Sequence, residues 1–389
     1  MDNDQIVSLK GPDRVRKRPA VMFGSADGAG CTYAVCELLE IFVVEAFLGF
    51  SKKLSVCLEK DGTVEILSED RGFFIDERTV DGKPAWHGVF CDFYPAPRIA
   101  TKEYCKKLAT LHGVLYGAPE EVAKYQIDED ADLLLCAVQY ASQWMEVESV
   151  HDGIFSFLRF EKGYPVGTVR REESASSSYT RIRFRLDGEV FDECSFSFSE
   201  ISDCLCRAAV CVPGLTCCIS EGENKNVFHF PRGGVDYVRS LCGDSNVPVF
   251  QNEIEATGRD RYNYDPYDAR VRVFLAFTKQ AGGVFCFHNG DALDGGVHLD
   301  AAKEQLSRVL SYELNMEFDR YESIANRVVL LLESQCSVGK SRWYDSHCKS
   351  IKNPMIRDMC TDLFGQAFVN FVYENQAKIT SVLNGETGT

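Results

Sequence analysis

Two features that would indicate a membrane or nucleic-acid setting are missing from this sequence: a long apolar run and an excess of basic residues. The longest aliphatic stretch, residues 328–332, is far shorter than the ~20 residues of a membrane helix, and residues 1–19 have no apolar signal-peptide core. Acidic residues outnumber basic ones by 58 to 42, giving a formal net charge of −16. We therefore expect a cytoplasmic protein that has no membrane segment and does not bind DNA directly.

Paired CxxC knuckles, which a zinc site would need, are also missing, although the sequence has 17 cysteines. The cysteines are odd in number and spread over a long chain without a signal peptide, so a disulfide framework is not expected. We expect free, mostly buried thiols and no metal site. The densest group comprises Cys204, Cys206, Cys211, Cys217 and Cys218.

The composition has enough apolar material for packed cores. Of 389 residues, 45% are hydrophobic and 12% are aromatic, which excludes a disordered, collagenous or coiled-coil protein. Because a domain usually has ~100–200 residues, the length predicts two domains.

Hydrophobic periodicity in the first half predicts a helix and then hairpins. Residues 31–50 repeat apolar side chains at the spacing i, i+3, i+4, i+7, which predicts a helix that stops at Gly49. Alternating apolar residues flank Asp61-Gly62, a tight-turn signal, and the pattern returns at Asp152-Gly153 and before Asp187-Gly188. A helix followed by hairpins predicts an α+β fold rather than a parallel sheet.

The second half is expected to be another α+β unit. Residues 171–178 (REESASSS) predict an exposed loop, and Arg232-Gly233-Gly234 marks the domain boundary. Beyond it, residues 271–277 alternate as a strand, while residues 301–318 and 355–371 carry helical periodicity.

Three short motifs imitate functional sites. Residues 337–341 (SVGKS) end like a phosphate-binding P-loop, but its first glycine would fall at Ser334. Residues 346–348 (SHC) contain nucleophile and base types, yet adjacent residues rarely converge on one substrate. The basic run at 14–18 (RVRKR) could touch phosphate or act as a nuclear address, but a solvated or structurally pinned segment is the commoner outcome.

Several segments, read in order, resemble the B subunits of DNA gyrase and topoisomerase IV. The first is residues 9–19 (LKGPDRVRKRP), followed by Phe23-Gly24-Ser25 and the helix that carries Glu37. The others are residues 111–113 (LHG), 144–153, 160–167 (FEKGYPVG), 228–234 (FHFPRGG) and 289–299 (NGDALDGGVHL). The resemblance covers essentially the whole chain.

This resemblance implies a Bergerat (GHKL) ATPase-type sandwich over residues 1–232, followed by a ribosomal-S5-like transducer domain over residues 233–389. The family cleaves DNA with a later metal-binding domain and a partner subunit's tyrosine, so this sequence is expected not to pass DNA strands by itself. The implied partners are a second copy, as a homodimer, or a gyrase or topoisomerase subunit. Arm exchange between copies is not expected, because only residues 1–8 precede the Leu9 motif.

The resemblance places Glu37 at the position of the general base that activates water for attack on the γ-phosphate. Four residues on, Ile41 replaces the asparagine that holds Mg²⁺, so the ion would lose its protein ligand. Val44 replaces a second polar position on the same face. This largely apolar stripe is expected to pack against protein rather than a nucleotide.

In the family, an aspartate after the first hairpin accepts a hydrogen bond from the adenine amino group. Here the segment reads LSEDRGFF, with Ser68 in the aspartate's place and Asp70 in that of the first glycine, while Arg71 and Gly72 remain. A neutral acceptor in place of a charged one would weaken binding by ~1–2 kcal/mol. Shifting the alignment by one or two residues would put Glu69 or Asp70 on adenine instead.

The family's glycine-rich run, whose amides cradle the phosphates, corresponds to residues 125–136 (YQIDEDADLLLC), which contain no glycine. The acidic residues of this segment are Asp128, Glu129, Asp130 and Asp132. Their charges would oppose a triphosphate. The preferred alternative is an acidic turn that caps a helix over residues 133–142.

Two further positions complete the implied site. Thr180 retains a threonine that the family uses near adenine, but Tyr179 replaces the preceding glycine and is large enough to enter the adenine slot. The family's Gln-Thr-Lys loop aligns with residues 346–348, which leaves Lys349 one place out of register as a weak candidate for the lysine that reaches the γ-phosphate.

The resemblance thus predicts a type IIA topoisomerase ATPase and transducer module with a degenerate ATP site. We expect a pseudoenzyme that serves as a scaffold or modulator and uses neither ATP nor Mg²⁺. The alternative is a subunit that binds ATP and Mg²⁺, hydrolyses ATP slowly with Glu37, Thr180 and Lys349, and acts on DNA topology with a partner. Two other possibilities stay open: a protein that pairs with a genuine gyrase subunit and modulates it, and a remodelled pocket for a different ligand.

Overall fold

The computed structural model describes residues 9–47, 49–73, 75, 84–91, 129–259, 266–315, 321–336, 341–344 and 348–384. These residues form two compact units, one that ends at His229 and one that begins at Phe230. Each unit is treated by itself below. The expected domain boundary after residue 232 stays a prediction.

The first unit is built on a mixed sheet with the strand order β5-β4-β3-β7-β2-β1-β8-β9, in which β6 also pairs with β4. Neighbouring strands are antiparallel except β1 and β8, which are parallel. The strands are β1 (Lys53–Leu58), β2 (Thr63–Ser68), β3 (Ser142–His151), β4 (Ile154–Glu161), β5 (Tyr164–Pro165), β6 (Arg170–Glu173), β7 (Tyr179–Leu186), β8 (Thr216–Glu221) and β9 (Asn224–His229).

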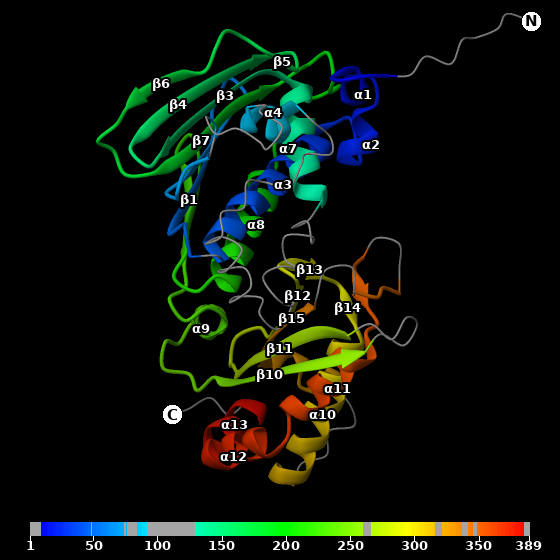
Figure 1. The fold of residues 1–389 in the computed structure, drawn as a ribbon. Coiled ribbons are helices and arrows are strands. Elements are labelled where there is room, and N and C mark those ends of the chain that lie inside the picture. The colour runs from blue at the N-terminus through cyan, green and yellow to red at the C-terminus, as the bar shows by residue number, and fades with distance from the viewer. Residues whose placement is uncertain are drawn as a thin grey trace, which may run out of the picture. The chain divides into compact units, whose positions relative to one another are not determined.

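Helices cover one face of this sheet and leave the other face open (Figure 1). The helices are α1 (Asp13–Arg16), α2 (Pro19–Phe23), α3 (Gly28–Phe47), α4 (Ala85–Cys91), α7 (Glu129–Ala141) and α8 (Phe198–Cys211). The core lies between the two layers, where the side chains of Leu38, Phe42, Ile66, Val147 and Phe184 are buried. Alternation along the strands sends every second side chain into this core, as the sequence predicts.

The hairpins expected at Asp61-Gly62 and Asp152-Gly153 are confirmed as β1–β2 and β3–β4. The prediction of a third hairpin at Asp187-Gly188 is wrong, because the chain leaves β7 there and continues to α8. The Asp187 carboxylate instead accepts a 2.5 Å hydrogen bond from Arg16, which pins the basic amino-terminal run to the fold. The loop expected at 171–178 is only partly correct, since its first residues belong to β6, which pairs with β4.

The second unit has a sheet with the order β10-β11-β15-β12-β13 and a small pair, β14-β16. These strands are β10 (Phe250–Arg259), β11 (Pro266–Phe277), β12 (Gly283–His288), β13 (Asp291–Leu293), β14 (Gly295–Gly296), β15 (Val328–Cys336) and β16 (Ser350–Ile351). Its helices are α9 (Gly234–Cys242), α10 (Val297–Leu314), η1 (Tyr321–Ser323), η2 (Ala325–Arg327), α11 (Pro354–Leu363), α12 (Gln366–Glu374) and α13 (Gln376–Leu383).

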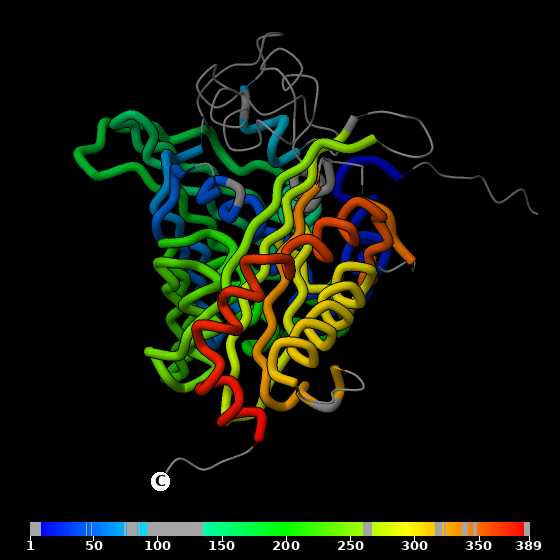
Figure 2. Tube along the Cα trace, turned by 90° about the horizontal axis from the view of Figure 1, so that it is seen from below, coloured from blue at the N-terminus to red at the C-terminus, as the bar shows by residue number. Residues whose placement is uncertain are grey.

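Helices α10 to α13 lie on one face of the second sheet, and α9 lies on the other (Figures 1 and 2). The strand expected at 271–277 is confirmed within β11, and the helix expected at 301–318 corresponds to α10. The prediction of a single helix over residues 355–371 is wrong, because α11 ends at Leu363 and α12 begins at Gln366. The break lets Phe364 and Phe368 pack around Phe250 of β10, with ring centroids 6.3 and 4.9 Å away.

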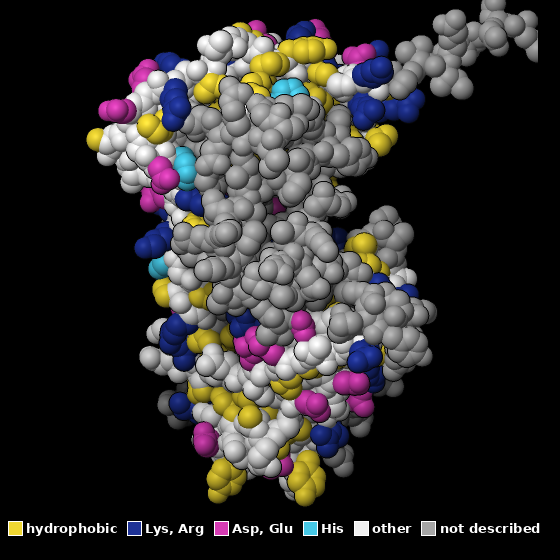
Figure 3. Space-filling model, viewed as in Figure 1, with side chains coloured by type: hydrophobic (Ala, Val, Ile, Leu, Met, Phe, Trp, Pro, Cys, Tyr) yellow, Lys and Arg dark blue, Asp and Glu magenta, His cyan; other side chains and the backbone are white. Residues whose placement is uncertain are grey.

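Neither unit offers a membrane-spanning element among its described residues, since no helix there is long and apolar enough to cross a bilayer. On the described part of the face in Figure 3, acidic and basic side chains are interspersed rather than gathered by sign. This mixture gives that part of the face no continuous basic surface for a phosphate backbone.

Candidate functional site

Helix α3 carries three positions of interest on consecutive turns of one face. Glu37 is half-buried, Ile41 is 1% exposed and Glu45 is 7% exposed. The Ile41 side chain is thus packed within the protein, while the expectation that this stripe excludes a nucleotide stays a prediction. The Val44 side chain lies outside the described part of the structure.

Glu45 forms a two-pronged ion pair with Arg71, which follows β2. The Arg71 Nε donates to Glu45 Oε2 at 2.8 Å, and its Nη2 donates to Glu45 Oε1 at 2.9 Å. The guanidinium also lies over the Phe50 ring, 4.4 Å from its centroid. This parallel geometry fixes the loop after β2 against the end of α3.

Gly72 occupies a position that only glycine fits. Its φ is +80°, and a Cβ added there would lie 2.3 Å from the carbonyl oxygen of Val150 in β3. The close approach of backbone to backbone explains why this residue is glycine. Its expected part in nucleotide binding stays a prediction.

Asp70 and Thr180 form a buried polar pair beside this glycine. The Asp70 Oδ1 accepts hydrogen bonds of 2.9 Å from both the Gly72 N–H and the Thr180 hydroxyl, and both side chains are buried. Burial raises the pKa of the Asp70 carboxyl to about 6, while these hydrogen bonds lower it. Of the alternatives at residues 68–70, the residue that places a carboxylate beside Thr180 is therefore Asp70.

Ser68 supports this pair from the neighbouring strand position. It is paired with Thr180 in the β2–β7 register, and its fully buried hydroxyl lies 2.9 Å from that of Ser51. Its hydrogen bond also lowers the pKa of Asp70. The structure thus brings Ser68, Asp70, Gly72 and Thr180 together, and the shifted alignment with Asp70 as the carboxylate fits the geometry.

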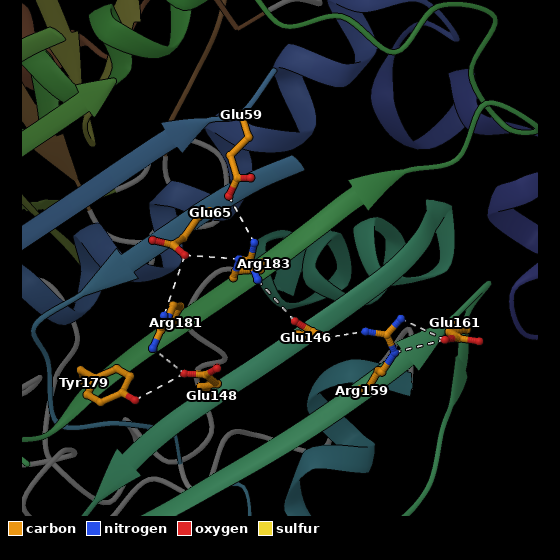
Figure 4. Close-up of polar contacts among 9 residues, drawn as sticks. All are labelled: Glu59, Glu65, Glu146, Glu148, Arg159, Glu161, Tyr179, Arg181 and Arg183. Atoms are coloured by element: carbon orange, nitrogen blue, oxygen red, sulfur yellow. Dashed lines mark hydrogen bonds and ion pairs between the residues drawn. The ribbon is translucent and has the colours of Figure 1, made fainter. Parts of the chain in front are cut away.

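Tyr179 does not belong to this group, and the expectation that it lines the same pocket is wrong. Adjacent residues of a strand point to opposite faces of a sheet, so the burial of Thr180 sends Tyr179 to the open face. There its hydroxyl donates to Glu148 at 3.4 Å, and Arg181 lies 5.8 Å from its ring centroid (Figure 4).

The open face carries a network of ion pairs across β2, β7, β3 and β4 (Figure 4). Arg183 contacts Glu59, Glu65 and Glu146 at 3.2, 3.3 and 3.7 Å. The remaining pairs are Arg181 with Glu65 and Glu148, and Arg159 with Glu146 and Glu161. Because glutamates outnumber arginines in this network, it does not offer a cationic surface to DNA.

The loop after Gly72 leads into an aromatic cluster rather than an open space. The Phe73 ring lies 6.2 Å from Phe42 of α3 and 6.0 Å from Phe90 of α4. Phe90 in turn packs 5.6 Å from Phe160 of β4. These contacts hold α3 and α4 to the sheet beside the Asp70–Thr180 pair.

The acidic segment is described only in part. Helix α7 begins at Glu129, so Asp130 and Asp132 lie in its first turn and the helix starts four residues earlier than expected. Carboxylates are favoured at a helix amino terminus, where a phosphate would otherwise bind. Residues 125–128 and the side chains of residues 129–134 lie outside the described part.

Lys349 belongs to the second unit. Its exposed side chain donates from Nζ to the Ala292 carbonyl at 3.3 Å, and the preceding Cys348 has a φ of +55°. Residues 337–340, Ser346 and His347 lie outside the described residues, so the P-loop-like and Ser-His-Cys motifs are not described as sites. The part of Lys349 in nucleotide chemistry stays a prediction.

The residues present fit a purine base better than they fit Mg²⁺. The carboxylate of Asp70 and the lone pairs of the Thr180 hydroxyl are acceptors, which suit the amino group of adenine, while the one hydroxyl proton of Thr180 is donated to Asp70. Mg²⁺ prefers oxygen ligands, and Ile41 has none to offer, while Glu45 is engaged by Arg71. Among the described residues, no group of three or more His, Cys, Asp or Glu could hold a metal ion.

No model of a known protein family matches the sequence. The B subunit of DNA topoisomerase 4 from Streptococcus pneumoniae is 28% identical over 319 residues, which cover 80% of this chain and 44% of that protein. The DNA gyrase B subunit of Thermotoga maritima is 27% identical over 312 residues, covering 79% and 46% of the two chains. The DNA gyrase B subunit of Staphylococcus aureus is 24% identical over 385 residues, covering 95% and 56%. This chain thus spans about half the length of these relatives.

Solved structures agree on the fold. The 43K ATPase domain of Thermus thermophilus gyrase B, in complex with an aminocoumarin, has a TM-score of 0.67 at 21% identity and covers 97% of this chain and 94% of its own. The B subunit of Myxococcus xanthus DNA gyrase has a TM-score of 0.66 at 15% identity, covering 96% and 99%. The homologues of this chain are therefore B subunits of DNA gyrase and topoisomerase IV, and its fold is the α+β GHKL ATPase unit followed by a transducer unit.

Proposed function

We propose that this chain is a gyrase-B-type ATPase and transducer module that does not hydrolyse ATP and serves as a scaffold or modulator of a topoisomerase. The observation that carries the proposal is Ile41, which is 1% exposed and lies one turn after Glu37 on α3. At that position the resemblance implies the Mg²⁺ ligand. An aliphatic side chain that is closely packed supplies neither an oxygen ligand nor room for a hydrated ion.

Electrostatics support the same proposal. Bound Mg²⁺ neutralises the charge that develops on a triphosphate during phosphoryl transfer, and this protein lacks a side-chain ligand for it at residue 41. The start of α7 adds acidic residues, among them Asp130 and Asp132, where the resemblance implies glycines and phosphate. Glu37 retains a carboxylate that could accept a proton from water, but a base acts only on a water that is held near a reacting phosphate.

A second candidate function, ATP binding with slow hydrolysis, is favoured by the buried pair of Asp70 and Thr180. A carboxylate that accepts hydrogen bonds inside the fold is costly unless it has a use or full compensation. The carboxylate and the hydroxyl lone pairs offer acceptors for the amino group of adenine. This candidate would preserve recognition of the base even where the metal ligand is missing.

Calorimetric titration with ATP, with and without Mg²⁺, tests the proposal, together with an assay of phosphate release. We expect no Mg²⁺-dependent phosphate release from the wild-type chain. Saturable, Mg²⁺-dependent binding tighter than ~1 mM, with hydrolysis that disappears in Glu37→Ala, would support the second candidate instead. Base-only recognition would give weak binding that Mg²⁺ does not change and that Thr180→Val removes.

A matched pair of substitutions tests the role of residue 41. Ile41→Asn supplies the missing ligand, whereas Ile41→Leu keeps the site apolar. If the missing ligand is what prevents hydrolysis, only Ile41→Asn gains Mg²⁺-dependent affinity for ATP, and thermal unfolding must confirm that this variant is folded. The modulator role is tested by affinity purification from the native cell, where failure to recover any topoisomerase subunit contradicts it.

A further inference from the structure

Two half-buried cysteines from distant parts of the chain meet between helices α3 and α8. Cys36 of α3 and Cys204 of α8 are 168 positions apart in sequence, yet their sulfur atoms are hydrogen-bonded at 2.9 Å. Both belong to the first unit, and all cysteines that the structure describes are free thiols. Such proximity between free thiols is one of the geometric requirements for forming a disulfide.

A cation completes this pair. Arg207 lies one turn after Cys204 on α8, and its Nη2 donates to the Cys204 sulfur at 3.1 Å. The hydrogen bond with Cys36 and the positive charge of Arg207 lower the pKa of Cys204 below that of an ordinary thiol, against the effects of burial and of Asp203. The same sulfur–sulfur hydrogen bond and burial raise the pKa of Cys36, and the negative charge of Glu37 raises it further. In the thiol form Cys204 donates to the Cys36 sulfur. The guanidinium of Arg207 favours ionisation of Cys204, after which the Cys36 thiol donates to the Cys204 thiolate instead.

We propose that Cys36 and Cys204 are a reversible redox pair that hydrogen peroxide closes into a disulfide between α3 and α8. Cys204 is the attacking residue and Cys36 the resolving residue. Neither role is part of the nucleotide chemistry discussed above.

The reaction balances in two steps. The Cys204 thiolate attacks one oxygen of peroxide, so that an S–O bond forms, the O–O bond breaks and hydroxide leaves, which takes up a proton to give water. The Cys36 sulfur then attacks the Cys204 sulfur, forming the S–S bond as the S–O bond breaks, and the departing oxygen with the Cys36 proton leaves as a second water. Two thiols are oxidised by two electrons in all, and a dithiol reductant restores them.

The movement required is small. A disulfide has an S–S length of about 2.0 Å, so the sulfur atoms must approach by about 1 Å from their present separation. The bond would tie α3, which carries Glu37 and Ile41, to α8. Oxidation would thus restrain the helix that holds the candidate catalytic position.

A second cysteine pair provides the internal comparison. Cys31 of α3 lies near Cys194, but burial and the nearby Cys194 raise the pKa of Cys31 to about 12, and the pKa of Cys194 is also raised by burial. The charge of Arg185 lowers the pKa of Cys194 but does not outweigh burial, so this pair is not held as a thiolate in the way that Cys204 is. We therefore expect peroxide to act on Cys204 first.

Peptide mapping of the peroxide-treated chain tests the proposal. Trypsin leaves Cys31 and Cys36 on one peptide and leaves Cys194, Cys204 and Cys206 on another, because no Lys or Arg separates them. The full-length chain with Cys31→Ser and Cys194→Ser is therefore treated at pH 7 with equimolar peroxide. We expect these two peptides to become linked with the loss of two hydrogen atoms, and dithiothreitol to release them.

Matched variants assign the link and the order of attack. Cys36→Ser and Cys204→Ser, each added to that background, must abolish the link, whereas Cys206→Ser on the same helix must preserve it. Cys36→Ser should leave a sulfenic acid on Cys204, which dimedone traps. Arg207→Gln should slow the reaction by roughly threefold to tenfold at pH 7.

The contrary results are equally clear. Absence of the link in the folded Cys31→Ser, Cys194→Ser chain overturns the proposal, as does a link that survives Cys204→Ser. Trapping of a sulfenic acid on Cys36 rather than Cys204, or an unchanged rate in Arg207→Gln, overturns the assigned order of attack. Circular dichroism of each variant before oxidation establishes that it is folded.

Discussion

The hydroxyl of Thr180 donates a 2.9 Å hydrogen bond to the carboxylate of Asp70, and both side chains are buried in the first unit. The contact joins β7 to the loop after β2. Because the Gly72 N–H donates to the same carboxylate oxygen, Asp70 holds this loop in place as well as facing the threonine. A buried carboxylate with these partners responds to pH, which makes the contact measurable.

The first prediction concerns Asp70→Asn and the pH dependence of stability. Burial raises the pKa of Asp70 to about 6 in the folded chain, above its ordinary 3.8. Its stabilising contribution is therefore complete below about pH 4 and is lost as the pH rises through 6. Relative to Asp70→Asn, we expect the wild type to lose up to about 3 kcal/mol of unfolding free energy between pH 4 and pH 7.5.

Urea unfolding at several pH values measures this difference. Trp86 and Trp144 belong to the first unit and Trp343 to the second, so fluorescence in a Trp343→Phe background reports the first unit alone. A difference between wild type and Asp70→Asn that does not change with pH would contradict the buried, partly protonated carboxyl.

The second prediction compares two glycines with nearly the same φ. Gly72 and Gly49 have φ values of +80° and +79°, but a Cβ on Gly72 would lie 2.3 Å from the Val150 carbonyl oxygen, whereas one on Gly49 meets no atom of the described residues within 4 Å. We expect Gly72→Ala to destabilise the first unit by about 3 kcal/mol or more and Gly49→Ala by about 1–2 kcal/mol.

The comparison separates steric contact from the strain of a positive φ, because the two residues share that φ and differ in what a Cβ would meet. The same tryptophan fluorescence and urea titration apply. Equal losses for the two variants would show that the loop moves away from Val150 and that the close approach is not required.

Local elements could be predicted from the sequence, because their signals are local. The apolar spacing of residues 31–50 predicts α3, and the Asp-Gly turns at Asp61-Gly62 and Asp152-Gly153 predict two hairpins. The break between α11 and α12 was not predictable in this way, because helical periodicity continues through Gly365. The parallel pairing of β1 with β8 carries no local signal at all.

The candidate site depends on such distant pairing. Asp70 and Thr180 are 110 positions apart and meet because β2 pairs with β7, which alternation alone does not specify. The orientation of Tyr179 could have been predicted, since its neighbour Thr180 points the other way in a pleated strand. The pairing of Glu45 with Arg71 had a weaker signal, a charged residue within the apolar run of α3.

The third prediction concerns this Glu45–Arg71 ion pair. Both charges are mostly buried, so removing one leaves the other with unmatched desolvation. We expect Glu45→Gln to lower the unfolding free energy of the first unit by about 2–3 kcal/mol. Arg71→Lys should lower it nearly as much, because an ammonium cannot reproduce the two parallel hydrogen bonds.

An exposed ion pair of the same unit is the control. Asp13, at the start of α1, and Lys17, which caps its end, lie 2.9 Å apart with side chains 52% and 58% exposed. Lys17→Ala should change stability by less than about 0.5 kcal/mol. If Lys17→Ala and Glu45→Gln have similar effects, burial is not what gives the inner pair its importance.

The fourth prediction concerns two buried histidines of the second unit. Burial lowers the pKa of His288 to about 3 and that of His298 to about 4, and neither ring nitrogen of His298 has a hydrogen-bond partner among the described residues. A lowered pKa means that the neutral ring is favoured in the folded state, so the contribution is present above pH 6.5 and is lost as the pH falls toward 4. We expect each histidine to remove about 2 kcal/mol of stability between pH 6.5 and pH 5.

Trp343 reports on this unit directly, since its ring lies 5.4 Å from that of His288. In a Trp86→Phe, Trp144→Phe background, urea unfolding followed by its fluorescence should show stability falling with acid. His298→Leu should remove about half of the fall in stability with acid, because leucine takes up no proton. His229→Gln, at an exposed histidine of the first unit, is the control and should leave this fall unchanged. If the pH dependence of stability is unchanged in His298→Leu, the proton is taken up by another group and the prediction for His298 is wrong.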